Sequence, residues 1–120
     1  MIEMLDIGLN NVVAYRLEGK ITEAEMISVM ALLREKIQQG EKINIYQEIV
    51  SLGGVEMDAM VEKFKFFMDV GISHFDKVAV VSSKKWLQKL IRIEDKLFKG
   101  INMKGFSTEE KNEALAFLKQ

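Results

Sequence analysis

The sequence contains no cysteine and no proline, and it has one histidine among its 120 residues. Without cysteine the chain can form no disulfide, no zinc–thiolate site and no thiol nucleophile. The single histidine, His74, has no second imidazole or thiolate with which to build a metal site. The carboxylates also form no evident acid–base pair, and those that begin predicted helices are explained by the helix dipole. We therefore expect a protein that works by binding, with no enzymatic activity, metal or other cofactor.

Long apolar runs are absent as well, since no run approaches the roughly 18 residues that a membrane-spanning helix needs. Acidic residues, Glu3 and Asp6, stand where a signal peptide carries positive charge. These two observations predict a cytoplasmic protein. The net charge of −1 argues against a nucleic-acid partner. The length and the ordinary composition indicate a single domain over residues 1–120.

The apolar pattern predicts an α/β fold with the order β-β-α-β-α-β-α-β-α. Alternating or continuous apolar runs predict strands, which we expect at residues 2–7, 12–18, 43–50, 77–82 and 101–106. Helical spacing predicts helices between Thr22 and Gly40, over 56–70, over 84–98 and after Ser107. Strands that alternate with helices favour a mixed, mainly parallel sheet with helices packed against it, and the first two strands favour a hairpin.

Several local patterns sharpen this prediction. Two capping boxes, Thr22-x-x-Glu25 and Ser107-x-x-Glu110, make Thr22 and Ser107 the expected N-caps of the first and last helices. The apolar run at 78–81 is typical of a strand that is covered on both faces. Helical spacing in the first helix places one core-facing row at Met26, Val29, Met30, Leu33 and Ile37. The segment 51–54 is expected to be a loop.

Five segments along the chain carry a resemblance to a known family: 19–22 (Gly-Lys-Ile-Thr), Gly53-Gly54, 71–75, Trp86, and 106–110 with the helix that follows. In this order and spacing, the chain resembles the SpoIIAA-like family of small bacterial proteins, which has the STAS-like fold of anti-sigma-factor antagonists. The resemblance implies a regulatory binding domain and also a relation to lipid-binding folds.

The loop after the third predicted strand differs from that of true antagonists. In those proteins a phosphorylatable serine begins the second helix in an Asp-Ser-Ser-Gly-like loop. Here Ser51 is the nearby serine, it precedes Gly53 and Gly54, and no aspartate stands before it. The resemblance therefore implies a protein partner that docks near Ser51, Gly53 and Gly54, without a clear phosphorylation switch.

The predicted helix 84–98 suggests a different kind of partner. Spacings of four and three residues align five cations on one face: Lys85, Lys89, Arg92, Lys96 and Lys99. A second row at the same spacing is apolar and contains Trp86 and Ile93. A basic face beside an apolar strip with a tryptophan suits a helix at an anionic membrane surface. The alternative is a solvated outer face on a helix that Trp86 anchors to the core.

The predicted helix 56–70 is rich in large soft side chains, including Phe64, Phe66 and Phe67. Such residues suit an apolar-ligand or lipid pocket, and the alternative is that they belong to an ordinary core. Two function hypotheses result. The first is a membrane-associating or apolar-ligand-binding domain, located at the inner membrane face when bound. The second is a protein-interaction regulator resembling anti-sigma-factor antagonists. Extra apolar surface on either helix also allows a homodimer.

Overall fold

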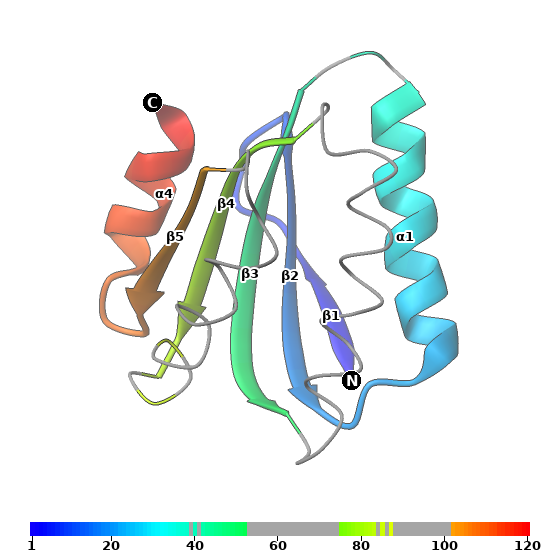
Figure 1. The fold of residues 1–120 in the computed structure, drawn as a ribbon, viewed down its shortest axis with the longest axis horizontal. Coiled ribbons are helices and arrows are strands. Elements are labelled where there is room, and N and C mark those ends of the chain that lie inside the picture. Colours follow the sequence, from blue (N-terminus) through cyan, green and yellow to red (C-terminus); the bar gives the residue numbers. More distant parts are fainter. Residues whose placement is uncertain (39, 41, 53–74, 84, 86, 88–101) are drawn as a thin grey trace.

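The structure is a computed structural model that describes residues 1–38, 40, 42–52, 75–83, 85, 87 and 102–120. Within these residues the chain forms five strands and two helices (Figure 1). Their bounds are β1 Ile2–Leu5, β2 Val12–Gly19, α1 Glu23–Gln38, β3 Ile43–Leu52, β4 Phe75–Ser82, β5 Asn102–Ser107 and α4 Lys111–Lys119. The helices predicted at 56–70 and 84–98 lie outside the described residues, except for Lys85 and Leu87, which are helical.

The five strands form one sheet in the order β1-β2-β3-β4-β5. Strand β1 pairs with β2 in antiparallel fashion, and every other neighbouring pair is parallel. The predicted hairpin and the mainly parallel sheet are therefore confirmed. Because β2, β3, β4 and β5 are parallel, their carboxyl ends all lie at the same end of the sheet.

Several strand bounds differ from the prediction, and two of them change a local interpretation. Strand β1 stops at Leu5 and not at residue 7, because the chain turns there: Asp6 Oδ1 accepts the Gly8 N–H at 3.0 Å, and Gly8 has a φ of +76°. That backbone angle strongly favours glycine. Strand β3 continues to Leu52, so Ser51 lies in the strand and not in the expected loop.

Side chains alternate between the two faces of the sheet and build two apolar layers. One layer joins α1 to the sheet through Val29 and Leu33, and it includes Val13, Tyr15, Leu17, Ile45, Val78 and Val80. The other joins α4 to the sheet through Ala114 and Phe117, and it includes Ala14, Tyr46, Ala79, Val81 and Phe106. Figure 1 shows α1 and α4 on opposite sides of the sheet. The run at 78–81 is thus covered on both faces, as predicted.

One of the two predicted capping boxes is confirmed. Before α1, Thr22 Oγ accepts the Glu25 N–H at 3.2 Å, and Glu25 Oε1 accepts the Thr22 N–H at 3.1 Å. The prediction that Ser107 caps the last helix is wrong. Ser107 is the last residue of β5, and α4 begins only at Lys111, with Glu110 as its N-cap. Residues 107–110 form a turn instead, since the Glu110 N–H donates to the Ser107 carbonyl at 2.9 Å.

A buried asparagine, Asn44, connects α4 to the sheet at the amino end of the parallel strands. Its Nδ2 donates to the Leu118 carbonyl at 3.2 Å, and its Oδ1 accepts the Lys77 N–H at 3.0 Å. Its own backbone N–H donates to the Asn11 carbonyl at 2.9 Å. Because every one of these polar groups is satisfied, the burial of Asn44 carries little penalty and it holds β3, β4 and α4 together.

Replacing Leu33 with alanine should lower the free energy of unfolding by about 2–5 kcal/mol, because Leu33 is fully buried between α1 and the sheet. Chemical denaturation monitored by circular dichroism measures this change. The matched control is Ile27→Ala on the same helix. Ile27 is 59% exposed, so its replacement should change stability by about 0.5 kcal/mol or less. Equal effects of the two variants would contradict the assigned faces of α1.

Candidate functional site

A hollow of 370 Å³ lies at the carboxyl edge of the parallel strands, on the α4 side of the sheet. In open α/β sheets, ligands usually bind outside the carboxyl ends of the strands. All four parallel strands or the residues that directly follow them contribute to the hollow, and so does the start of α4. The lining consists of Arg16, Glu18, Glu48, Ile49, Val50, Val81, Ser83, Thr108 and Lys111.

The buried carboxylate of Glu48 is part of the lining of this hollow. Arg16 on β2 and Glu48 on β3 are register partners, so their side chains stand next to each other on one face. Glu48 Oε2 accepts a hydrogen bond from Arg16 Nε at 2.8 Å, and Oε1 accepts one from the Tyr46 hydroxyl at 2.7 Å. Lys111 Nζ on α4 lies 3.3 Å from Glu48 Oε1. A carboxylate that is only 9% exposed is therefore paired with two cations.

The electrostatics of this cluster favour fixed charges over proton transfer. Burial acts to raise the pKa of Glu48, but hydrogen bonds from Arg16 and Tyr46 and the charges of Lys111 and Arg16 outweigh burial, so its pKa is lowered. The hydrogen bond and charge of Glu48 raise the pKa of Arg16. Burial, followed by Glu48, raises the pKa of Tyr46. Near neutral pH the cluster thus holds Arg16 and Glu48 charged and Tyr46 protonated, an arrangement suited to binding.

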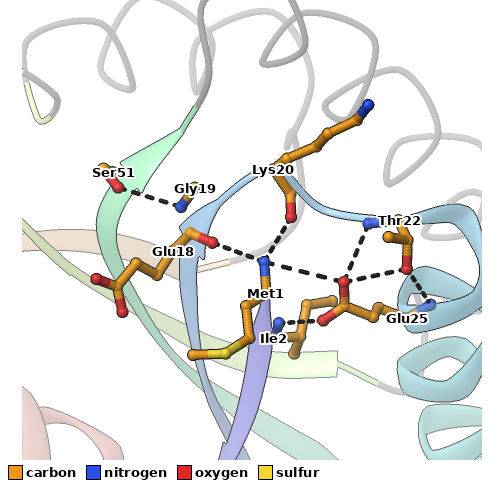
Figure 2. A network of polar contacts seen from close by, with 8 residues as sticks. All are labelled: Met1, Ile2, Glu18, Gly19, Lys20, Thr22, Glu25 and Ser51. Carbon is orange, nitrogen blue, oxygen red and sulfur yellow. Dashed lines mark hydrogen bonds and ion pairs between the residues drawn. The ribbon is translucent and has the colours of Figure 1, made fainter.

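Ser51 lies two residues from the hollow-lining Ile49, on the exposed end of β3. Its Oγ accepts the Gly19 N–H at 3.1 Å, which joins the end of β3 to the end of β2 (Figure 2). The register between these strands shifts between Leu17 and Glu18, and Ser51 is paired with Glu18 after the shift. Ser51 is therefore held in a strand, with its hydroxyl bound to backbone.

The turn from β2 to α1 is held from the opposite side by the start of the chain (Figure 2). The Met1 ammonium donates to the Glu18 carbonyl at 2.6 Å and to the Lys20 carbonyl at 2.5 Å. Glu25 Oε2 accepts the Ile2 N–H at 2.5 Å. This bond, followed by those from Thr22, lowers the pKa of Glu25. Contacts from β1, β3 and α1 thus fix residues 18–22 beside the hollow.

Comparison with known proteins identifies the family. A family model described as SpoIIAA-like matches residues 12–119. The chain belongs to the SpoIIAA-like family. No curated protein and no solved structure matches it. The match confirms the resemblance seen in the sequence, and the mixed five-stranded sheet agrees with the STAS-like α/β fold expected for a SpoIIAA-like domain.

Most of the site residues predicted from the sequence lie outside the described part of this SpoIIAA-like domain. They stay predictions and comprise Gly53, Gly54, Phe64, Phe66, Phe67, Trp86, Lys89, Arg92, Ile93 and Lys96. Ser51 and Lys85 are described, and both are exposed. Among the described residues, no cluster of histidine, cysteine, aspartate and glutamate could hold a metal ion, and no helix is long and apolar enough to span a membrane.

The cluster of Arg16, Glu48 and Lys111 in this SpoIIAA-like domain was not predicted from the sequence. A signal for two of these residues was present, because Arg16 and Glu48 interrupt the apolar strands 12–18 and 43–50. Their pairing depends on the register between β2 and β3, which the pattern of a single strand does not reveal. Lys111 stands 63 positions after Glu48, and only the packing of α4 brings it close.

Replacing Glu48 with glutamine should lower the free energy of unfolding at pH 7 by about 1–3 kcal/mol, because Arg16 and Lys111 lose a buried anionic partner. The pKa of Glu48 is lower in the folded than in the unfolded protein, so its contribution is present above the ordinary glutamate pKa of 4.5. As the pH falls through the folded-state pKa, the contribution is lost.

Urea denaturation of wild type and Glu48→Gln between pH 7 and pH 2.5 measures this difference, which should shrink toward zero in acid. The matched control is Glu3→Gln, since Glu3 pairs with the same Arg16 at 3.1 Å but is half exposed. Its replacement should change stability by about 0.5 kcal/mol or less. A stability difference for Glu48→Gln that stays constant at every pH would show that the carboxylate charge is not responsible.

Proposed function

We propose that this SpoIIAA-like domain is a regulatory module that binds a protein partner in the manner of anti-sigma-factor antagonists and performs no catalysis. The observation that carries the proposal is the ordered, exposed surface at the carboxyl ends of β2 and β3, around Ser51. Membership of the SpoIIAA-like family supports a regulatory role of this kind. We name this region, residues 18–20 with 50–51, the Ser51 surface.

The Ser51 surface has the mixed character of a protein interface. Val50 is 51% exposed and lines the hollow. Ser51 is the next residue along β3, so its side chain points to the opposite face of the strand. Glu18 lines the same hollow as Val50, and both Glu18 and Lys20 are exposed. Exposed apolar and polar groups together are typical of non-obligate interfaces.

Preorganisation further supports binding at the Ser51 surface. The Gly19 N–H is bonded to Ser51 Oγ, and the carbonyls of Glu18 and Lys20 are bonded to the Met1 ammonium (Figure 2). A backbone that is already fixed loses little conformational entropy when a partner docks. The proposal requires no phosphorylation, in agreement with the departure of this loop from the antagonist pattern.

Ser51→Asp should abolish or strongly weaken partner capture, because it places a negative charge beside Glu18 in the middle of the docking surface. Affinity capture from cells that produce the protein, followed by mass spectrometry, compares wild type with the variant. The matched control is Ser28→Asp, which makes the same charge change at an exposed position on α1 whose hydroxyl contacts the Ala24 carbonyl. If wild type, Ser28→Asp and Ser51→Asp all capture the same proteins in equal amounts, docking at this surface is contradicted.

The second candidate function is association with an anionic membrane through the segment 84–98. One described observation favours it. The Leu87 N–H donates to the Ser83 carbonyl at 3.0 Å, and Leu87 lies so close to β5 that a Cβ at Gly105 would stand 2.9 Å from its Cδ2. Two residues earlier, Lys85 is exposed. Two residues apart in a helix, these positions face nearly opposite directions. With Leu87 against the sheet, Lys85 therefore faces outward, where the predicted basic face begins.

Wild-type protein should co-sediment with vesicles of phosphatidylglycerol and phosphatidylcholine at low salt, and the triple variant Lys89/Arg92/Lys96→Glu should not. Each cation near an anionic leaflet contributes about 1 kcal/mol, and added salt should weaken binding. Vesicles of phosphatidylcholine alone serve as the uncharged control. Failure of the wild-type protein to bind anionic vesicles at low salt would end this candidate and leave the Ser51 surface unaffected.

A further inference from the structure

We propose that the hollow at the carboxyl ends of β2–β5 is a binding site for an anionic group, a carboxylate or a phosphate, with Lys111 and Arg16 as its principal donors. This site goes beyond the proposed function, because it stands whether or not a protein partner docks at the Ser51 surface. The anion can be a free small molecule or an acidic side chain of a bound protein. The two sources share one chemistry.

The first argument is the depth at which each charge lies in the hollow. The Glu48 side chain is 9% exposed, whereas those of Arg16 and Lys111 are 32% and 49% exposed. An entering group therefore meets the two cations before it meets the carboxylate behind them. Both cations are paired with Glu48, and Arg16 is also paired with the half-exposed Glu3.

The second argument is the hydrogen-bonding capacity that the cluster retains. A guanidinium has five N–H donors. Among the described residues, Arg16 uses Nε for Glu48 and Nη1 for Glu3. An ammonium has three donors, and the described contact of Lys111 is the one with Glu48 at 3.3 Å. Charge-assisted hydrogen bonds to oxyanions are among the stronger polar contacts in proteins, so these donors favour an anion.

The third argument is the remaining lining of the hollow. Ser83 follows β4 and Thr108 follows β5, and both residues are exposed. Their hydroxyls can donate to an oxyanion from the part of the hollow next to β4 and β5, whereas Arg16 donates from β2. Val81 and Val50 supply apolar walls. Glu18 is the one other acid of the lining, and it opposes the anion from the edge at β2.

Amide NMR titration with sodium phosphate, at ionic strength matched with sodium chloride, tests the proposal. We expect saturable shifts at the amides of Ser83, Thr108 and Lys111. The dissociation constant should rise about three- to fivefold in Lys111→Gln, a modest factor because this side chain is half exposed. Lys111→Arg should bind as wild type does, and Glu18→Gln should bind more tightly.

The matched control is Lys119→Gln, which removes an exposed cation from the far end of the same helix and should leave the dissociation constant unchanged. Thermal unfolding of each variant shows whether it is folded at the titration temperature. Should Lys111→Gln unfold, the Lys111→Arg and Glu18→Gln variants still test the predicted direction. Equal dissociation constants for wild type, Lys111→Gln and Glu18→Gln, or the lack of any saturable shift, would overturn the proposal.

A second arm distinguishes the two sources of the anion. The probes are a capped pentapeptide with one central aspartate and the same peptide with asparagine in its place. Tighter binding of the aspartate peptide than of phosphate, lost with asparagine, supports an acidic side chain of a partner. Tighter binding of phosphate supports a free anion. The anion titrations and the partner capture with Ser51→Asp are independent measurements. A hollow that binds no anion and a Ser51 surface that binds no partner would therefore be recognised separately.

Discussion

The paired charge of Glu48 is the constraint on which the carboxyl end of this domain depends. A buried carboxylate is strongly unfavourable unless cations and hydrogen bonds compensate it. Here Arg16, Tyr46 and Lys111 supply that compensation from β2, β3 and α4. The same contacts therefore hold α4 to the sheet, fix the positions of two cations and form the floor of the hollow. The ionic cluster is at once a structural joint and the most distinctive surface of the described chain.

The two ends of the parallel strands differ in a way that bears on function. At the amino end, Asn44 uses its side-chain and backbone polar groups to join β3, β4 and α4, which closes that end. At the carboxyl end, polar groups surround a hollow and the exposed Val50 and Ser51. A scaffold that is closed at one end and preorganised at the other favours a binding role, in keeping with the SpoIIAA-like family.

The family match begins at residue 12, yet residues before it help to shape the Ser51 surface. Ile2 binds Glu25, the Met1 ammonium binds the β2–α1 turn, and Glu3 pairs with Arg16 (Figure 2 shows the first two). Strand β1 thus adds contacts to the frame that the matched region builds. Those contacts all involve residues 16–25. The edge strand β1 and the residue before it therefore support both the hollow and the Ser51 surface.

Local periodicity and turn chemistry were enough to predict the strands, the first helix, the hairpin and the Thr22 capping box. The SpoIIAA-like family was recognised by resemblance, from the order and spacing of five short segments. The sequence did not reveal that Ser107 ends a strand, since Ser-x-x-Glu also fits the turn that precedes α4. It placed Ser51 in a loop, because the pairing that extends β3 comes from β2. Only the tertiary structure joined Arg16, Glu48 and Lys111. Their meeting depends on strand register and helix packing, which are interactions between segments distant in the chain.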